Sequence, residues 1–403
     1  MRAAATWSSS RGDGMNVDRL IPDYVRKFEP YAPSRPDHLL MREYGAPFLY
    51  RLNNNENTLG PPPAAQRVID EFPPELVPLY PSGDAYDLRQ ALARRFGFAA
   101  ERFLVGNGSC EVIGAIIKAF CERGDNIVTA DKTFAVYEWV ARFSGIEARL
   151  VPLRDHAFDA EAMLARMDRH TKIVFVCNPN NPTGTYWPTG VLTDFLDRAG
   201  ENRIVVVDEA YAEYVGKSDY PDAMALMERY PNLVVFRTFS KMYALASLRV
   251  GYMTGSAEVV DAVRRTCIAY SVNALAQKAA EAALVDDKAH ILRSREIVRE
   301  ARAMLEPVLD ALDLPHVGGE GNYIMVKVPI NDTLMYRHLM RRGWMVRSMT
   351  GFRFPGWVRV TLREREAMER FAEAFAAEIR NVRGLFRFIQ DNIQKRATDH
   401  GHP

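Results

Sequence analysis

Short runs of apolar and β-branched residues alternate with longer amphipathic stretches through the middle of this chain. The runs predict seven strands, at 102–105, 126–130, 147–152, 172–177, 203–208, 233–237 and 249–254. Several stretches between them, among them 111–122 and 191–199, have the period of an amphipathic helix. This alternation predicts an α/β fold whose large domain holds a mainly parallel, seven-stranded sheet between helices.

The pattern changes after a long helical region at 273–312. Strands are expected at 322–328, 344–349 and 357–362, and helices at 332–342 and 364–380. These elements predict a second, smaller α+β domain. The expected division is a disordered extension or alternative start (1–14), an N-terminal arm that contributes to the small domain and to a dimer contact (15–75), a large domain (76–304), a small C-terminal domain (305–385) and a flexible tail (386–403).

Composition and charge narrow the functional classes. A chain of 403 residues with 48% hydrophobic and 26% charged residues is typical of a globular protein. The net charge of +1 provides no overall positive field for nucleic acid, and no apolar run approaches the roughly 18 residues of a membrane span. The four cysteines and eight histidines lack disulfide or metal-ligand spacing. We therefore expect a cytoplasmic protein without a metal site.

Candidate ligand-binding residues follow the ends of the predicted strands, where ligands collect in an open parallel sheet. The turn Gly106-Asn107-Gly108-Ser109 opens a helix, and its backbone N–H groups can seat a phosphate. The same sequence is also typical of an ordinary turn with a helix N-cap. The segment 178–184 combines two prolines, three asparagines and a glycine, which predicts a rigid turn with several hydrogen-bonding amides.

Asp208 and Lys241 are the strongest chemical signals. Asp208 ends a run of apolar residues, so its carboxylate needs a cation or donor at the mouth of a buried strand, unless it is simply a helix N-cap. Lys241 follows the next strand among hydroxyls and aromatic residues, where desolvation and nearby cations lower a lysine pKa and make the amine nucleophilic. Around it, Thr238, Ser240 and Arg249 suit a phosphate dianion.

Taken together, six motifs in order resemble those of the pyridoxal 5′-phosphate (PLP) enzymes of fold type I, the aspartate-aminotransferase-like superfamily. They are Asn55-Glu56-Asn57 with Gly60-Pro61, Tyr80-Pro81, Gly106-Asn107-Gly108-Ser109, 178–184, Asp208-Glu209-Ala210-Tyr211 and 238–249. The resemblance extends from about residue 22 to 380. Within the superfamily the chain is most similar to the histidinol-phosphate aminotransferases. The resemblance implies a homodimeric transaminase that uses PLP.

The resemblance also implies roles at the cofactor. Lys241 is expected to form the Schiff base with PLP and to shuttle a proton at the substrate, while Asp208 pairs with the ring nitrogen. The other implied cofactor contacts are Ser109, Cys110, Thr238, Ser240 and Arg249 at the phosphate, Phe134 against the ring, Asn181 and Tyr211 at its 3′-oxygen, and Tyr80 of the partner subunit. Cys110 stands where the family usually has an acidic residue, a change that spares backbone donation to the phosphate.

For the substrate, the resemblance implies that Arg359 binds an anionic end and that Arg347 assists when the anion is a phosphate, with Tyr31 and Asn55 also at the substrate. A surface arginine at a strand end is the alternative for Arg347. The expected reaction is ping-pong transfer from histidinol phosphate to 2-oxoglutarate, which gives imidazole acetol-phosphate and glutamate in histidine biosynthesis.

Three alternatives to this reaction are compatible with the sequence. Leu362-Arg363 replaces the Gly-Thr that usually follows the substrate arginine, which admits an aromatic or broad-range aminotransferase, or an enzyme like threonine-phosphate decarboxylase. A non-catalytic PLP-binding regulator is disfavoured because only a short arm precedes Tyr31 and the net charge is near zero.

Overall fold

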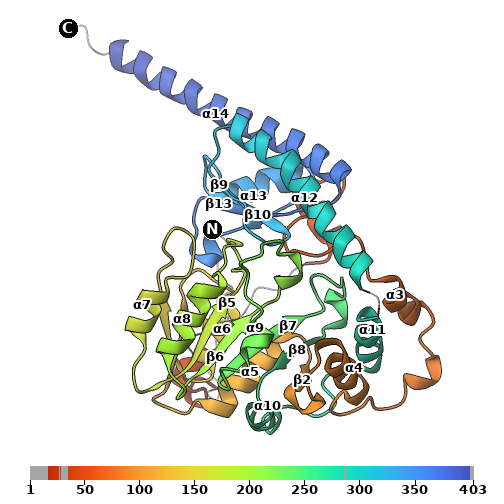
Figure 1. The fold of residues 1–403 in the computed structure, drawn as a ribbon. Coiled ribbons are helices and arrows are strands. Elements are labelled where there is room, and N and C mark those ends of the chain that lie inside the picture. Colours follow the sequence, from red (N-terminus) through yellow and green to blue (C-terminus); the bar gives the residue numbers. More distant parts are fainter. Residues whose placement is uncertain (1–16, 27, 29–34, 286, 400–403) are drawn as a thin grey trace, which may run out of the picture.

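The computed structural model describes residues 17–26, 28, 35–285 and 287–399. Its central sheet has the strand order β2–β8–β7–β6–β5–β3–β4 (Figure 1). The strands are β2 (Phe103–Gly106), β3 (Asn126–Ala130), β4 (Glu147–Val151), β5 (Thr171–Cys177), β6 (Ile204–Asp208), β7 (Leu233–Thr238) and β8 (Gly251–Thr254). Neighbouring strands from β4 to β7 run parallel, and β8 is antiparallel to both β7 and β2. The predicted mainly parallel, seven-stranded sheet is confirmed.

Helices cover the sheet in groups. One group joins α5 (Ser109–Phe120) to α6 (Val136–Phe143) and α10 (Ala257–Arg264), and another joins α7 (Ala160–Arg166) to α8 (Thr189–Ala199). A third consists of α3 (Pro63–Asp70), α4 (Tyr86–Phe96) and α11 (Ala274–Ala283), while the short α9 (Ala223–Leu226) packs beside β7. Every residue of β6 is buried, as expected for a parallel strand covered on both faces.

A smaller sheet forms the second domain. Its strand order is β12 (Arg347–Ser348), β13 (Trp357–Thr361), β10 (Tyr323–Lys327) and β9 (His316–Val317), all antiparallel. The single strand predicted at 344–349 is divided, because β11 (Trp344–Met345) leaves this sheet and pairs with β1 (Tyr50–Arg51) of the N-terminal arm. Helices α13 (Asp332–Arg341) and α14 (Arg365–Asp399) complete the domain, whose apolar core is separate from that under the large sheet.

Helix α12 (Lys288–Ala311) runs from the large domain into the small one (Figure 1). The helical region predicted at 273–312 is therefore two helices, α11 and α12. The first turns of α12 bury His290 and Ser294, whereas Ala301, Leu305 and Leu309 belong to the small-domain core. The domain boundary predicted at 304/305 falls inside this helix.

Both ends of the chain contain helices that the sequence analysis did not predict. The N-terminal arm contains α1 (Asp23–Arg26), α2 (Asp37–Tyr44) and α3, the last begun by a proline, which is well suited to the first helical position. At the other end, α14 continues through 386–399, where a flexible tail was predicted, because apolar positions keep their helical spacing beyond Arg380 (Figure 1). Among the described residues, no helix is both long and apolar enough to span a bilayer.

Candidate active site

The candidate cofactor residues meet at one edge of the large sheet. Asp208 ends β6, in register with Cys177 at the end of β5 and with Phe236 of β7. Thr238 ends β7 and pairs with Gly251, the first residue of β8. Because the carboxyl ends of neighbouring parallel strands lie at the same edge, the loops after β5, β6 and β7 bring Asn181, Tyr211 and Lys241 together there.

Asp208 is a buried carboxylate held by neutral donors. The Tyr137 hydroxyl donates to Oδ2 at 2.5 Å, and the backbone N–H of Ala210 donates to Oδ1 at 3.1 Å. Burial raises the pKa of Asp208, and these two hydrogen bonds partly oppose the rise. A cation placed against this carboxylate would favour its ionised form. The position therefore fits the protonated ring nitrogen of PLP.

Lys241 is half-buried in the loop after β7. Its Nζ donates to the backbone carbonyl of Asn54 at 2.7 Å and lies 5.8 Å from the centre of the Tyr211 ring. Burial, followed by the positive charge of Arg359, lowers the pKa of Lys241 to about 8, against the opposing charge of Glu56. A substantial fraction of the amine is therefore neutral near physiological pH and able to attack a carbonyl carbon.

The predicted phosphate seat is assembled at the start of α5. Ser109 and Cys110 are its first two residues, and Gly108 precedes them with a φ of +73°. A Cβ on Gly108 would collide with the Arg249 guanidinium, so only glycine lets that side chain approach the turn. Arg249 also lies 3.4 Å from the Ser240 hydroxyl. The backbone N–H groups, hydroxyl and guanidinium together fit a phosphate dianion.

The thiol of Cys110 lies among the charges of this site. Burial raises its pKa, although the charges of Arg249 and Lys241 oppose the rise and that of Asp208 adds to it. The thiol is therefore protonated at neutral pH.

Asn55 joins the arm to both domains. Its Nδ2 donates to the Tyr211 hydroxyl at 2.9 Å, and its backbone N–H donates to the Thr361 hydroxyl of β13 at 3.0 Å. Its φ of 57° lies in the left-handed region that asparagine tolerates. The sequence assigned Asn55 to the substrate; in the structure it contacts Tyr211, a candidate cofactor residue, and the small domain, and its contact with a substrate stays a prediction.

Arg359 is the buried cation of the site. One guanidinium nitrogen donates to Asn181 Oδ1, and Nη2 donates to the Asn53 carbonyl at 2.8 Å. Within the described part of the chain, its buried Nε has no hydrogen-bond partner. Burial lowers the pKa of Arg359, and Tyr211 and Tyr323 partly oppose this. The guanidinium is held by neutral acceptors and keeps a donor available for an anion.

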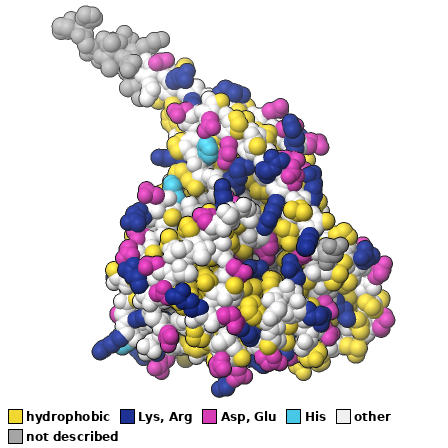
Figure 2. Space-filling view, viewed as in Figure 1, with side chains coloured by type: hydrophobic (Ala, Val, Ile, Leu, Met, Phe, Trp, Pro, Cys, Tyr) yellow, Lys and Arg dark blue, Asp and Glu magenta, His cyan; other side chains and the backbone are white. Residues whose placement is uncertain are grey.

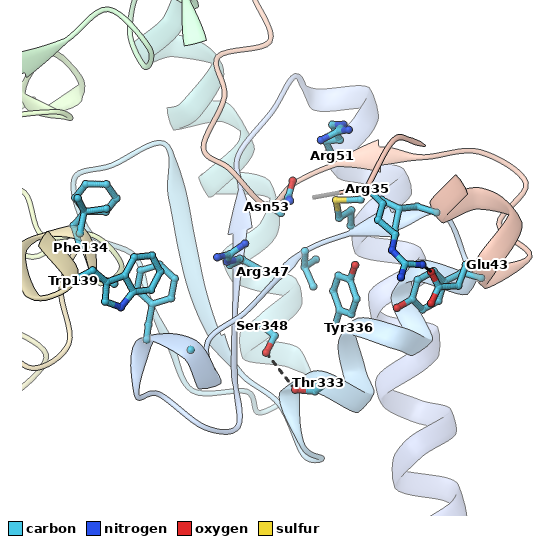
Figure 3. Close-up of a pocket in the computed structure, with 18 residues that line it drawn as sticks. Arg35, Glu43, Arg51, Asn53, Phe134, Trp139, Thr333, Tyr336, Arg347 and Ser348 are labelled. Atoms are coloured by element: carbon cyan, nitrogen blue, oxygen red, sulfur yellow. Dashed lines mark hydrogen bonds and ion pairs between the residues drawn. The ribbon is translucent and has the colours of Figure 1, made fainter. Parts of the chain in front are cut away.

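A cavity of about 880 Å³ lies between the two domains beside these residues. Figure 3 shows Phe134 and Trp139 of the large domain on one side and Arg347 of β12 facing them, with Asn53 nearby. Asn53 connects the cavity to the lysine, because its own carbonyl binds Arg359 and the next carbonyl binds Lys241. Phe134 and Arg347, both predicted as site residues, are thus brought into one cavity.

Among the described residues, one predicted site residue lies apart from this arrangement. Tyr80 is 85% exposed, and its ring lies 5.0 Å from that of Tyr270. Its predicted contribution to the site of a partner subunit stays a prediction. Tyr31 lies outside the described residues.

Several residues of the site were missed from the sequence. Asn53 and Asn54 contribute backbone carbonyls, which no side-chain pattern reveals, although the run of three asparagines at 53–55 could have drawn attention to this segment. Tyr137 carries its hydroxyl to Asp208 from an amphipathic helix, where a tyrosine resembles any other core residue. The Leu362-Arg363 departure is mainly structural: Leu362 is buried in the small-domain core, and the Arg363 guanidinium lies 5.4 Å from the centre of the Tyr50 ring.

Comparison with known proteins agrees with this geometry. A family model described as aminotransferase class I and II matches residues 49–375. Similar curated proteins include a histidinol-phosphate aminotransferase of Anaeromyxobacter sp. (strain Fw109-5), 38% identical over 353 residues that cover 87% of this chain and 96% of the relative. Another is histidinol-phosphate aminotransferase 2 of Pseudomonas aeruginosa, 39% identical over 352 residues, with 87% and 95% covered.

Solved structures show the same fold. A histidinol-phosphate aminotransferase of Sinorhizobium meliloti, in complex with pyridoxal 5′-phosphate, superimposes with a TM-score of 0.81 at 24% identity, covering 90% of this chain and 98% of that one. A Thermus thermophilus aspartate aminotransferase double mutant has a TM-score of 0.76 at 23% identity, with 89% and 99% covered.

The fold, the charged edge of the sheet and the family match define a PLP-dependent transaminase of fold type I: this chain belongs to the aminotransferase class I and II family. Curated relatives over most of its length are histidinol-phosphate aminotransferases, as the sequence motifs predicted. The predictions of the fold class, of an aminotransferase and of PLP as its cofactor are confirmed.

Proposed function

We propose that this chain transfers the amino group of histidinol phosphate to 2-oxoglutarate, giving imidazole acetol-phosphate and glutamate in histidine biosynthesis. We further propose that it acts as a homodimer in the cytoplasm, with one amino donor and one 2-oxo acid alternating at the same site. The curated relatives support the reaction, and the side chains of the site support it as follows.

The cofactor would be held at three points. The start of α5 with Thr238, Ser240 and Arg249 would bind its phosphate, Asp208 its ring nitrogen, and Lys241 its aldehyde carbon. When bound, PLP supplies an electron sink that acidifies the Cα–H of an attached amino compound. The buried carboxylate of Asp208 would keep the ring nitrogen protonated, which this chemistry requires.

Lys241 would move the proton. Its pKa is lowered to about 8, which leaves the amine able to take a proton from the substrate Cα. The amine would then return this proton to the aldehyde carbon of the cofactor. The Asn54 carbonyl that accepts its hydrogen bond holds the amine at the edge of the sheet.

One observation carries the choice of a phosphorylated substrate. Arg347 and Arg359 are directly opposite each other on antiparallel strands β12 and β13, so their side chains lie on the same face of the small sheet. The two positive charges repel each other in this arrangement. After burial, the charge of Arg347 adds to the lowering of the Arg359 pKa. A dianion between the two guanidiniums removes this cost, whereas an amino-acid carboxylate is satisfied by one of them.

An aromatic donor is the second candidate, because aromatic rings line the same cavity. Phe134, Trp139, Tyr336 and Phe352 form much of its wall. Such a wall accommodates the imidazole of histidinol phosphate and equally the ring of phenylalanine. A decarboxylase acting on a phosphorylated amino acid would also use the arginine pair.

A donor screen tests the proposed reaction. The PLP-loaded enzyme is mixed with histidinol phosphate, phenylalanine, glutamate or threonine phosphate, and conversion to the pyridoxamine form is followed by absorbance. We expect histidinol phosphate to have the highest kcat/KM. A higher kcat/KM for phenylalanine would indicate an aromatic aminotransferase. Release of CO₂ from threonine phosphate would indicate a decarboxylase. Absorbance that no donor changes would favour a non-catalytic PLP-binding protein.

The homodimer is supported by an exposed apolar surface near Tyr80. Its members, each more than half exposed, are Val77, Leu79, Tyr80, Tyr86, Ile268 and Tyr270. Figure 2 shows hydrophobic side chains on this side of the molecule, beside α3 and α4. An exposed apolar surface of this kind is typical of a protein–protein interface. We propose that a second copy of the chain covers it and that Tyr80 of the partner subunit completes each site.

Mixed dimers test this arrangement. Lys241→Ala and Tyr80→Ala subunits, each of low activity alone, are unfolded and refolded together. If Tyr80 acts across the interface, the mixture regains activity, because each mixed dimer has one site with both native residues. No recovery in a mixture shown to contain mixed dimers would place Tyr80 in its own subunit's site or outside the site.

A further inference from the structure

The backbone beside Lys241 is held from outside its own loop. The carbonyl of Met242 accepts two hydrogen bonds, from His290 Nε2 and from Asn57 Nδ2, each at 2.8 Å. His290 belongs to α12 and Asn57 to the N-terminal arm, so both donors come from segments distant in sequence. The residue adjacent to the lysine is therefore fixed by two donors that take no part in the loop itself.

The chemistry of His290 is defined by this contact. A carbonyl oxygen only accepts, so the proton of the imidazole must be on Nε2. His290 is 7% exposed, and burial lowers its pKa, although the Met242 carbonyl and the charge of Asp287 oppose the shift. The ring is neutral at physiological pH and acts as a fixed hydrogen-bond donor.

The lysine loop needs such anchors. Ala244 and Arg249 have φ values of 55° and 56°, in the left-handed region that residues with a Cβ rarely adopt. Conformations of this kind persist where surrounding contacts impose them. Here one contact with α12 and one with its N-cap residue do so, because the Tyr243 hydroxyl also donates to Asp287 Oδ2 at 2.8 Å.

Asn57 links the two anchoring segments. Its Nδ2 lies 2.9 Å from the Ser294 hydroxyl of α12 as well as 2.8 Å from the Met242 carbonyl. Further along α12, Ala301 and Leu305 are buried in the small-domain core. The backbone at the lysine is thus tied to a helix that also belongs to the domain carrying Arg359.

We propose that His290 is a positioning residue for Lys241: by donating to the Met242 carbonyl, together with Asn57, it fixes the backbone from which the lysine side chain extends. The proposal rests on the proposed role of Lys241. A lysine has four rotatable side-chain bonds, so an unsecured backbone spreads the amine over many positions, and displacements of about 1 Å at reacting groups lower rates by about 100-fold.

Paired variants test it in the PLP-loaded enzyme. His290→Leu removes the donor, and His290→Gln keeps an N–H of similar reach. We expect His290→Leu to lower kcat by about 10- to 100-fold with little change in KM, and to shift the pH midpoint of the lysine–cofactor absorbance by at least half a unit. His290→Gln restores most of both. Should His290→Leu not fold, His290→Met removes the donor with a more adaptable side chain.

The control is Asn232→Leu. Asn232 is also buried and donates to two carbonyls, those of Gly200 and Arg203, but at the start of β7 rather than at its end. The Asn232→Leu variant also loses buried hydrogen bonds to backbone carbonyls. We therefore expect a lower midpoint of thermal unfolding, with kcat and the absorbance titration unchanged. If Asn232→Leu and His290→Leu lower kcat equally, the effect is general destabilisation and the proposal is wrong.

A double mutant tests the shared carbonyl. If His290 and Asn57 act through Met242, the effect of His290→Leu on kcat is smaller in an Asn57→Leu background than alone. Independent, multiplicative effects would overturn this part of the proposal. Failure of the underlying assignment is recognised separately: the lysine–cofactor absorbance would then survive Lys241→Ala, whereas failure of the positioning role leaves His290→Leu with native kcat and titration.

Discussion

The two halves of the candidate site are built in different ways. The cofactor half belongs to one sheet, because Asp208 and Thr238 end neighbouring strands and Ser109 begins the helix after another. The substrate half is assembled from separate parts of the chain. Arg347 and Arg359 come from the small domain, and the cavity wall opposite Arg347, including Phe134, comes from the large one.

This difference predicts two kinds of functional effect. Groups fixed by a single sheet are placed before any substrate arrives, so their loss removes chemistry and lowers kcat. Groups shared between domains define the space for the substrate, so their loss changes kcat/KM and the preference among donors. Asn55 connects the halves, since it contacts Tyr211 on one side and Thr361 on the other.

The largest effect is expected from Lys241→Ala in the cofactor half. It removes both the point of covalent attachment and the proton carrier, and we expect kcat to fall by at least about 10⁴-fold, with the lysine–cofactor absorbance lost. Stopped-flow absorbance on the PLP-loaded protein measures both. Lys217→Ala, at an exposed lysine 3.8 Å from Glu320, serves as the control. Near-native transamination by Lys241→Ala would contradict the assignment.

The same difference explains what the sequence could predict. Asp208 ends one apolar run, and Thr238 and Lys241 follow the strand predicted at 233–237, so their order along the chain places them at the sheet edge. Even so, their identification as cofactor residues needed the resemblance of the ordered motifs, because the physical pattern of Asp208 alone also suits a helix cap.

The substrate half was harder to predict, because it depends on contacts between distant segments. The pairing of β1 with β11 and the division of 344–349 into two strands determine where Arg347 points, and neither follows from local periodicity. The extension of α14 is a different case, because the apolar spacing that continues past Arg380 is local and could have predicted it. Backbone carbonyls such as that of Asn54 leave no trace in sequence.

A smaller loss is expected from Asp208→Asn, also in the cofactor half. The amide still accepts from Tyr137 but carries no charge to keep a ring nitrogen protonated, so we expect kcat to fall by about 10²- to 10³-fold. Tyr137→Phe removes only the neutral donor and is expected to cost about tenfold or less. Steady-state kinetics with a thermal melt of each variant checks the order. A larger effect for Tyr137→Phe would mean that the charge is not the main contribution.

In the substrate half, Arg359→Ala and Arg347→Ala are expected to lower kcat/KM for different sets of donors. Arg359→Ala should lower kcat/KM for all anionic donors by the equivalent of about 2–5 kcal/mol. Arg347→Ala should cost about 1.5–3 kcal/mol, and only with a phosphorylated donor. Because it also removes a like charge opposite Arg359, it should stabilise the ligand-free protein by about 0.2–1 kcal/mol. Equal losses with phosphorylated and unphosphorylated donors would remove Arg347 from phosphate recognition.

The smallest effect tests how far the halves are coupled. The positive charge of Arg359 is, after burial, the main cause that lowers the pKa of Lys241 to about 8 from the usual 10.5. Removing that charge favours the protonated amine, so Arg359→Ala should raise this pKa by a fraction of a unit to about one unit. Only the neutral amine reacts with an acylating reagent, and modification of Lys241 in the cofactor-free protein, measured by mass spectrometry across pH, gives the midpoint.

The free energy of unfolding also depends on the Lys241 pKa, and the direction of its change with pH is fixed. Between about 8 and 10.5 the unfolded lysine still holds a proton that the folded one has released, so this group makes stability rise with pH across that window. Arg359→Ala should raise the lower limit of this pH range, because it raises the pKa of folded Lys241. Arg359→Lys keeps a positive charge and should leave that pKa closer to 8. If Arg359→Ala and the native chain share one midpoint, the charge of Arg359 does not set the amine pKa, and this arginine of the substrate half exerts no electrostatic control over the cofactor half.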